Sequence, residues 1–373
     1  MTSPERIRVL HIIQNLHYGG MERLIAEIAR TIDRDRFETH VLGLQYLGRF
    51  SHDMDESVTL HTGAKLPRWS MLWPGPLIDQ IREIAPDVVH SHSGVWYKAS
   101  LAAKKAGVPR IVHTDHGRAL PDSWMHRKVD GIASRRTDVV IAVSQKLGDY
   151  LAKHLVAPSC RVEVVINGVD TDVFRPRTDT GVIRAELALA AGVPVIGSIG
   201  RLEYIKGYDV MVEAMAILHD GWDTRADGPA PHLVIAGDGS QRAALESRAR
   251  ELRIAKNIHF LGWRNDIHEL HATFSLFTMS SRSEGTSVSL LEAMASGLVP
   301  VVTDVGGNRA VLGDELAPRI VPASNPEALA EQWKDVLVNG AARERDAAVG
   351  RARVQSEFDL ERFVKAYEKI YEG

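Results

Sequence analysis

The sequence is almost devoid of cysteine. Cys160 is the only one among 373 residues, so the chain cannot form an intrachain disulfide or a zinc site built from cysteines. Long hydrophobic runs are also missing, because no stretch approaches the roughly 18 consecutive apolar residues that a membrane-spanning helix needs. The first residues lack the apolar core of a signal peptide. These absences predict a cytoplasmic protein whose contact with a membrane, if it has any, is peripheral and at the inner face.

A strong charge of either sign is absent too. The formal net charge is −3, which argues against a nucleic-acid-binding protein, because such proteins usually carry a strongly basic face. With 45% hydrophobic and 25% charged residues, the composition is globular and not that of a disordered, collagenous or coiled-coil chain. A length of 373 residues exceeds what one hydrophobic core usually supports, so we expect two domains.

Two series of short β-branched segments alternate with amphipathic segments. The first series spans residues 8–13, 39–44, 87–90, 110–113, 138–144 and 162–166, and the second spans residues 194–200, 232–239, 257–262, 274–279 and 299–303. Strands bounded by helices are typical of a parallel sheet covered on both faces. The polar, turn-rich segment 167–181 separates the two series. The pattern predicts an α/β fold with two doubly wound, Rossmann-like domains, residues 1–175 and 176–357, and a final helix over 358–373.

Gly19 and Gly20 occupy the first turn that follows a predicted strand. In open parallel sheets, ligands bind beyond the carboxyl ends of the strands. The two glycines precede a predicted helix whose first N–H groups could face an anion, although a simple tight turn would also account for them. The turn is not the dinucleotide-binding G-x-G-x-x-G pattern, and the chain has no G-x4-G-K-[ST] phosphate loop, which disfavours a dehydrogenase or an ATPase.

Histidines gather after two further strands of the first domain, in segments 90–93 and 113–118. The candidate metal ligands there would be His90, His92, His113, Asp115 and His116. Their spacing matches no known metal motif, so we predict no metal and expect strand-end histidines to hydrogen bond substrate or backbone. His116 is the strongest candidate site residue, because Gly117 would let a ligand approach the backbone closely.

In the second domain, the segment GRLEYIKGYD (200–209) follows a strand and leads into a helix. Arg201 and Lys206 can converge on one anionic group if the loop folds back, and Gly200 and Gly207 allow the tight turns. Two cations beside a helix start suit a diphosphate. The alternative is that both are ordinary surface cations of a loop.

The segment SRSEGTSVSLLEAMASG (281–297) carries two carboxylates eight residues apart, Glu284 and Glu292. A helical rise of 1.5 Å per residue separates them by about 12 Å, so one ligand with hydroxyl groups at two places could be held at both. Between them, Gly285, Thr286 and Ser287 supply N–H groups at a helix start, which suit a phosphate or sugar oxygen. A plainer interpretation makes Ser283 or Thr286 a helix cap and Glu284 a carboxylate favoured by the helix dipole, and it places Glu292 on a solvated face. The apolar neighbours of Glu292 argue against it.

These segments together resemble the glycosyltransferases of the GT-B fold, specifically the retaining, nucleotide-sugar-dependent transferases of family 4. The resemblance rests on residues 19–22, 113–117, 166–170, 200–207, 236–239, 260–266 and 284–297. It implies two Rossmann-like domains that face a central cleft, the first on the acceptor side and the second binding the donor nucleotide. It also implies that the final helix, from Phe358 onward, packs back on the first domain.

The resemblance implies a role for each site residue of the second domain. Arg201 and Lys206 would neutralise the donor diphosphate. Glu292 would hold the ribose hydroxyl groups. Glu284, with the N–H groups of residues 285–287, would hold the transferred hexose.

The resemblance also implies roles for residues elsewhere in the chain. Gly19 and Gly20 would approach the donor phosphate from the first domain, and His116 would contact the sugar near the reacting centre. Trp263 and Arg264 would flank the nucleobase.

One departure from the family pattern concerns Gly306-Gly307-Asn308-Arg309-Ala310, where a frequent carboxylate is missing and Arg309 takes its neighbourhood. This leaves the donor sugar open. No metal-binding D-x-D motif lies in a suitable place, since Asp53-Met54-Asp55 falls in an early polar segment. We therefore expect metal-independent transfer, in which protein cations and helix N–H groups stabilise the leaving nucleoside diphosphate.

The resulting prediction is a retaining transferase that moves a hexose-type sugar from a nucleoside-diphosphate sugar to a glycan or lipid-linked acceptor, as in exopolysaccharide biosynthesis. The alternatives are a nucleotide-sugar hydrolase or epimerase of the same fold, and a catalytically silent sugar-nucleotide-binding subunit. Segment 66–77, with Trp69, Met71, Leu72 and Trp73, could form an acceptor-binding or membrane-surface lip, or could pack on the first domain.

Overall fold

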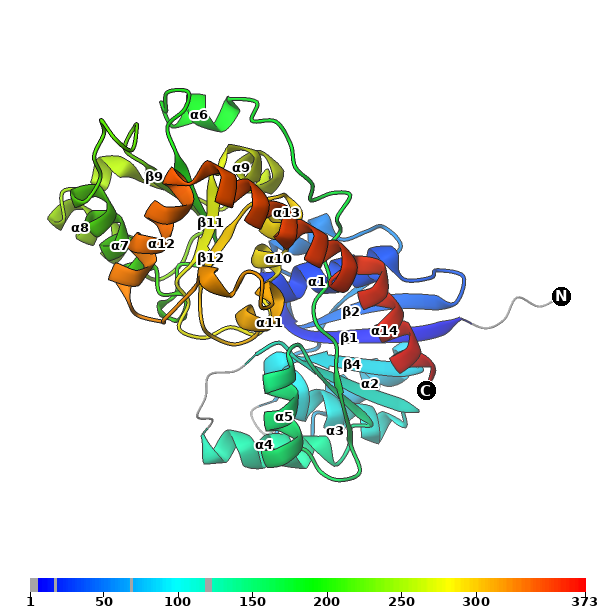
Figure 1. The fold of residues 1–373 in the computed structure, drawn as a ribbon. Coiled ribbons are helices and arrows are strands. Elements are labelled where there is room, and N and C mark those ends of the chain that lie inside the picture. Colours follow the sequence, from blue (N-terminus) through cyan, green and yellow to red (C-terminus); the bar gives the residue numbers. More distant parts are fainter. Residues whose placement is uncertain (1–5, 17–18, 68–69, 118–122) are drawn as a thin grey trace. The chain divides into compact units, whose positions relative to one another are not determined.

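The computed structural model describes residues 6–16, 19–67, 70–117 and 123–373 (Figure 1). The chain divides into two compact units. The first comprises Met1–Gly168 and Leu360–Gly373, and the second comprises Val169–Asp359. The first unit is therefore built from both ends of this sequence.

The first unit contains a seven-stranded, wholly parallel sheet in the order β3-β2-β1-β4-β5-β6-β7. Its strands are β1 (Ile7–Asn15), β2 (Phe37–Tyr46), β3 (Thr59–Thr62), β4 (Val88–His92), β5 (Arg110–Asp115), β6 (Val139–Ala142) and β7 (Arg161–Val164). β4, at the centre of the sheet, and β6 are buried along their whole length, as expected when helices cover both faces of a sheet. The connecting helices are α1 (Gly20–Thr31), α2 (Gly75–Ile84), α3 (Trp96–Ala106), α4 (Trp124–Ser134) and α5 (Gln145–His154), with short 3₁₀ turns at Arg49–Asp53 and Ser93–Val95.

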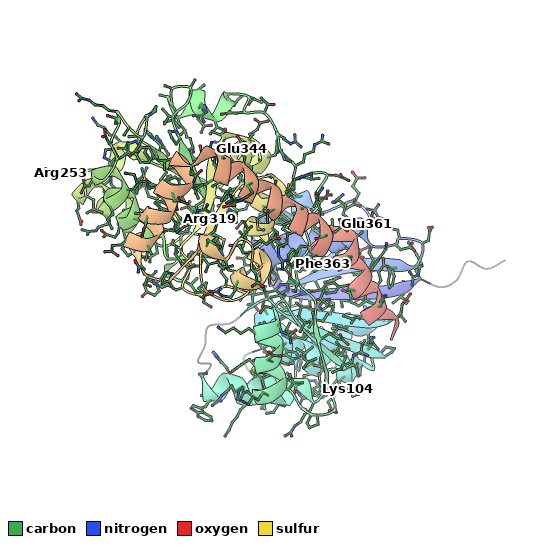
Figure 2. The ribbon with its side chains drawn as sticks, viewed as in Figure 1. Lys104, Arg253, Arg319, Glu344, Glu361 and Phe363 are labelled. Carbon is green, nitrogen blue, oxygen red and sulfur yellow. The ribbon has the colours of Figure 1, made fainter. Side chains whose placement is uncertain are left out.

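The helix α14 (Leu360–Glu372) completes this unit and contacts α1 and β1 (Figure 1). Its apolar residues recur at helical spacing, so one face is buried and the other is solvated. Phe363 lies on the buried face, whereas Glu361, two residues earlier, is exposed (Figure 2). The hydroxyl groups of Tyr367 and Tyr371 reach into the sheet, where Tyr371 bonds His90 at 2.8 Å.

The second unit contains a six-stranded parallel sheet in the order β10-β9-β8-β11-β12-β13. Its strands are β8 (Val195–Ile199), β9 (His232–Ala236), β10 (Ile258–Gly262), β11 (Leu276–Met279), β12 (Pro300–Thr303) and β13 (Ile320–Val321). Its helices are α6 (Val182–Glu186), α7 (Tyr208–Asp220), α8 (Arg242–Glu251), α9 (Ile267–Thr273), α10 (Val288–Ala295), α11 (Asn308–Leu312), α12 (Pro326–Val338) and α13 (Gly340–Glu357), with 3₁₀ turns at Tyr204–Lys206, Ala255–Asn257 and Ala317–Arg319. Arg319, which Figure 2 labels, is 5% exposed and is neutralised by Asp335 at 2.5 Å and Asp346 at 2.7 Å.

The predicted fold class, two doubly wound parallel α/β domains, is confirmed. Two strands were not predicted. β3 reads Thr-Leu-His-Thr and has a single aliphatic residue, while β13 has only two residues, so neither forms a recognisable hydrophobic run. Within the described ranges, no helix combines the length and the apolar character needed to cross a bilayer.

Candidate active site

The second unit reverses its strand order between β8 and β11. Doubly wound sheets bind their ligands at such a point, just beyond the strand ends. The loop 200–207 follows β8 and the loop 280–287 follows β11. These two loops carry most of the residues that the sequence predicted to bind the donor.

Lys206 and Glu284 join the two loops through an ion pair. Lys206 Nζ lies 2.5 Å from Glu284 Oε1, and the same oxygen accepts a 2.6 Å hydrogen bond from Ser281 Oγ. The side chain of Glu284 is 8% exposed and that of Lys206 is 22% exposed, so water screens the pair only in part. A shielded ammonium beside a shielded carboxylate offers a place for a ligand that carries an anionic group next to hydroxyl groups.

Gly207 makes the close approach of these loops possible. Its φ is +66°, in the left-handed region, and a Cβ at this position would lie 2.1 Å from the carbonyl oxygen of Ser280. Ser280 Oγ in turn donates a 2.7 Å hydrogen bond to Gly207 O. The residue after Lys206 must therefore be glycine for the Lys206 side chain to reach Glu284.

Arg201 lies on the same loop and is exposed. It forms no side-chain hydrogen bond or ion pair with the described part of the chain. Hydrogen bonds from the Ser240 hydroxyl and backbone N–H lower the pKa of the neighbouring Glu203, with a smaller contribution from the charge of Arg201. The Arg201 guanidinium thus remains available to an anion at this edge of the sheet.

α10 begins at Val288, four residues after Glu284. Ser287 precedes the helix but makes no capping hydrogen bond, because its hydroxyl contacts Ser289 Oγ at 3.1 Å. The residue at the N-cap is thus Ser287, and not Ser283 or Thr286 as the plainer interpretation has it, and the helix start carries a partial positive charge. Gly285 O accepts a 2.8 Å hydrogen bond from Gly307 N, which ties this turn to the Gly306-Gly307 pair.

Glu292 lies inside α10 and is only 1% exposed. The alternative that it sits on a solvated face is wrong. Carboxylates are almost never so completely buried unless other groups compensate them. The burial of Glu292 at this helix is consistent with a functional carboxylate.

Trp263 and Arg264 follow β10 and differ in their surroundings. Trp263 exposes 48% of its surface. Arg264 donates to Asp266 at 2.6 and 2.8 Å and to Glu186 at 2.8 and 3.0 Å, and these hydrogen bonds raise its pKa. The guanidinium is therefore held within the second unit, while the indole is open to a ligand. Their placement beside a nucleobase stays a prediction.

In the first unit, the strand order reverses between β1 and β4, and the predicted residues again lie at the strand ends. Gly19 immediately precedes α1, whose first residue is Gly20. A Cβ on Gly19 would lie 2.5 Å from Glu22 Oε2, so a side chain there would displace that carboxylate. His116 follows β5, and burial lowers its pKa to about 4, which keeps the imidazole neutral at physiological pH.

The histidines predicted at the strand ends do not all come together. His113 stacks on Trp96 at 4.1 Å and contacts Ser91 Oγ at 3.0 Å, and Asp115 accepts from Gly117 N at 3.0 Å. A different set, His11, His90 and His92, places one ring nitrogen each within 4.8 Å of the others. His11 was missed because it stands in the apolar run of β1, although a histidine in a buried strand is itself a signal.

This cluster is a poor metal site as it stands. Both ring nitrogens of His90 are engaged, by Tyr371 Oη at 2.8 Å and Thr114 Oγ1 at 2.7 Å. Both nitrogens of His92 contact other histidines at 3.0 Å. A metal ion would have to replace these hydrogen bonds, because a ligating nitrogen needs its lone pair.

The predicted lip is partly visible. Leu72 exposes 80% of its surface, Trp73 44% and Met71 42%, and Lys105 Nζ lies 5.5 Å from the Trp73 ring centroid. The interpretation that this segment packs on the first unit is therefore wrong for Leu72, whereas Met71 and Trp73 are each a little more than half covered. Trp69 lies outside the described residues.

The sequence matches two known protein families. The family described as glycosyltransferase family 4 matches residues 18–173, and the family described as glycosyl transferases group 1 matches residues 179–353. EpsF of Bacillus subtilis, named as a glycosyltransferase, is 26% identical and the match covers 98% of this chain and 96% of EpsF. An Escherichia coli enzyme named UDP-Gal:α-D-GlcNAc-diphosphoundecaprenol α-1,3-galactosyltransferase is 25% identical, and the match covers 83% of this chain and 82% of the Escherichia coli enzyme.

Among solved structures, Anabaena HepE in complex with UDP and glucose superposes with a TM-score of 0.84. The match covers 98% of this chain and 99% of HepE at 21% identity, and so establishes a shared fold. Two family matches that together span almost the whole chain, full-length relatives named as glycosyltransferases and this shared architecture agree with one another. The chain belongs to glycosyltransferase family 4 and has the GT-B fold.

Proposed function

We propose that this glycosyltransferase moves a hexose from a nucleoside-diphosphate hexose to a glycan or lipid-linked acceptor, with retention at the anomeric carbon. The observation that carries the proposal is the Lys206–Glu284 ion pair at the strand-order reversal of the second unit. It puts a cation suited to a phosphate directly beside a carboxylate suited to sugar hydroxyl groups. In a nucleotide sugar, the phosphate and the sugar hydroxyl groups lie on either side of the bond that breaks.

The leaving group is the first requirement of the reaction. Negative charge develops on the nucleoside diphosphate as the glycosidic bond breaks. Arg201, Lys206 and the uncapped first turn of α10 supply positive charge that needs no rearrangement at that moment. Gly19 and Gly20, at the start of α1, are proposed to contribute N–H groups to the same phosphate.

The sugar and the nucleoside of the donor need separate binding residues. Glu284 and the N–H groups of Gly285, Thr286 and Ser287 are proposed to bind the hexose, and Glu292 to bind the ribose. Trp263, which exposes 48% of its surface, is proposed to flank the base, and Arg264 of the same loop is held by Glu186. His116 is proposed to contact the sugar from the first unit as a neutral imidazole.

The transfer is proposed to need no metal ion, because the cations of the chain neutralise the diphosphate. Single-turnover reactions with excess enzyme should therefore keep their rate in EDTA, within about twofold of the untreated rate. Single turnover is essential, since slow product release in steady state could mimic a metal requirement. A chemical step that is abolished by EDTA and restored by a divalent ion would contradict the proposal.

Donor and reaction can be identified in two stages. Thermal shift with a panel of UDP- and GDP-hexoses finds the donor, because donor binding needs no acceptor. Nucleoside diphosphate release is then measured with and without candidate glycan and polyprenyl-diphosphate acceptors. Acceptor-dependent release supports a transferase. Equal release without acceptor would favour a hydrolase, and binding without turnover would favour a silent subunit.

A lipid-linked acceptor would require contact with a membrane surface, and the exposed side chains Met71, Leu72 and Trp73 are proposed to provide it. Flotation with vesicles that contain anionic lipid tests this, with Leu72→Ser and Trp73→Ser as variants expected to bind less. Ile217, an exposed apolar residue of α7, serves as the control when changed to Ser. Equal flotation of all variants would remove this segment from the proposal.

A further inference from the structure

Three histidines of the first unit form a continuous chain of hydrogen bonds that ends at His116. His11 Nδ1 lies 3.0 Å from His92 Nε2, and His92 Nδ1 lies 3.0 Å from His116 Nε2. Neighbouring ring centroids lie 5.3 Å apart in both pairs, with the ring planes inclined by 16° for His11 and His92 and by 30° for His92 and His116. His11 and His92 are 0% and 1% exposed, so water does not compete for these bonds.

The sheet register produces this arrangement. His11 of β1 pairs with His90 of β4, and His92 of β4 pairs with Thr114 of β5. Paired residues of parallel strands point to the same face, and so do residues two apart within a strand. Consequently His11, His92 and Thr114 share one face of the sheet. His116, the first residue after β5, contacts His92 through its Nε2.

The hydrogen-bonding capacity of neutral imidazole restricts the chain to two states. Each neutral ring has one N–H donor and one nitrogen lone pair as acceptor. Each hydrogen bond in the chain uses the N–H of one ring and the lone pair of its neighbour. In one state, protons point inward: His116 donates to His92, His92 donates to His11, and His11 Nε2 carries an N–H. In the other state, they point outward: His11 Nδ1–H donates to His92, and His92 Nδ1–H donates to His116 Nε2.

The buried end of the chain distinguishes the two states. His11 Nε2 is fully buried and has no hydrogen-bond partner among the described residues. The inward state would bury an N–H without an acceptor, whereas the outward state leaves only a lone pair. Buried N–H groups without a partner are rarer in proteins than under-satisfied acceptors. The outward state is therefore the favoured one.

We propose that His11 and His92 are positioning residues that fix His116 in the tautomer with its proton on Nδ1. In this tautomer, His116 Nε2 accepts from His92, and Nδ1–H is the one donor that His116 can present to a ligand. His11 and His92 act through His116 and touch no substrate. The inference rests on the proposed function only in assigning the sugar as that ligand.

Nuclear magnetic resonance of protein labelled with ¹⁵N-histidine tests the tautomer without any substrate. The ring nitrogens of His116, assigned by comparison with His116→Gln, should show a protonated Nδ1 and an unprotonated Nε2 at pH 7.5. His11→Asn keeps an amide donor near the position of Nδ1 and should preserve this signature. His11→Leu removes the donor, so the signal of His116 should shift toward the other tautomer.

Kinetics then tests the consequence. His11→Leu should lower kcat on the order of tenfold, the size of effect seen for groups that orient a functional histidine, while KM for the donor changes little. His11→Asn should recover most of this loss. The matched control is a second histidine pair, His40 on β2 and His61 on β3. His40 Nδ1 lies 2.9 Å from His61 Nε2. His61→Leu breaks that pair and should leave kcat unchanged.

The possible results separate this inference from the proposed function. Absence of transferase activity in the unaltered protein would refute the function but leave the tautomer measurement valid. A wild-type His116 protonated at Nε2 would overturn the inference even in an active enzyme, as would an unchanged spectrum and kcat in His11→Leu. Tight 1:1 binding of Zn²⁺ that is lost in His11→Asn would also overturn it, because ring lone pairs would then be metal ligands.

Discussion

Lys206 and Glu284 touch each other although they are proposed to hold different parts of the donor. Each therefore has a defined position before any ligand binds, and the Lys206 ammonium can contact a phosphate without a large rearrangement. Removing one such prearranged charge typically costs about 2.7–4 kcal/mol of transition-state stabilisation. We expect Lys206→Ala to lower kcat/KM by this amount, a loss of about 100- to 1,000-fold.

Arg201→Ala should lose a similar amount, and the double variant should lose less than the sum, because both cations act on one leaving group. Initial rates at subsaturating donor measure all three variants. Rates near that of the unaltered enzyme for both single variants would mean that the loop is an ordinary surface.

The two glutamates should separate kinetically. Glu292→Gln should mainly raise KM for the donor, because the ribose lies far from the bond that breaks. Glu284→Gln should mainly lower kcat, because its hydrogen bonds to the hexose strengthen as positive charge builds on the ring. Both substitutions conserve size, and melting temperatures of the variants control for the burial of Glu292. The opposite pattern would show that the two ends of the donor have been exchanged.

At the scale of elements, the loop after β8 depends on Gly207. Gly207→Ala combines a left-handed backbone with a collision against Ser280 O, so it should both destabilise the protein and displace Lys206. Gly181→Ala is the matched control: its φ is +78°, but no atom lies within 4 Å of the added Cβ. Chemical denaturation should show a loss of about 1 kcal/mol or more for both variants. Only Gly207→Ala should also lose transferase activity, and equal activity of the two would contradict the role of this turn.

The elements themselves were largely predictable from sequence, but their contacts were not. β-branched runs such as residues 138–144 identified buried parallel strands, and the motif at 284–297 identified the helix that carries Glu292. The contact between Lys206 and Glu284 was not predicted, because 78 residues separate them and only the strand order brings their loops together. His11 was missed for a related reason: its role becomes visible only once the register pairs it with His90 and its ring contacts His92.

At the scale of the whole molecule, buried histidines should make stability depend on pH. Burial lowers the pKa of His11 to about 3 and of His116 to about 4, and lowers the pKa of His90 and His92 well below the ordinary 6.5. Below pH 6.5, the unfolded chain binds protons that the folded chain excludes. Stability is therefore present above pH 6.5 and is lost as the pH falls, by up to about 1.4 kcal/mol per pH unit for each histidine.

The first unit contains all four of these histidines, so it should weaken first on acidification. Hydrogen exchange measured by mass spectrometry between pH 7.5 and pH 5.5, corrected for the intrinsic exchange rate, should show protection falling earlier in β1, β4 and β5 than in β8 and β11. His232 and His259 of the second unit also have lowered pKa values, so that unit should weaken to a smaller extent. Parallel loss of protection in both units would contradict this assignment.

The first unit is assembled from two separate stretches of chain, and this determines the order in which the two units can fold during translation. The helix α14 supplies Tyr371 to His90, yet all 191 residues of the second unit are translated between Gly168 and this helix. At about 5–20 residues per second, that interval lasts roughly 10–40 s. During this time the parts of α1 and β1 that α14 will cover stay exposed, while the second unit, whose residues are contiguous, can close its own core. The unit that is translated first is thus completed last, and the surface that awaits α14 is where a chaperone would bind the growing chain.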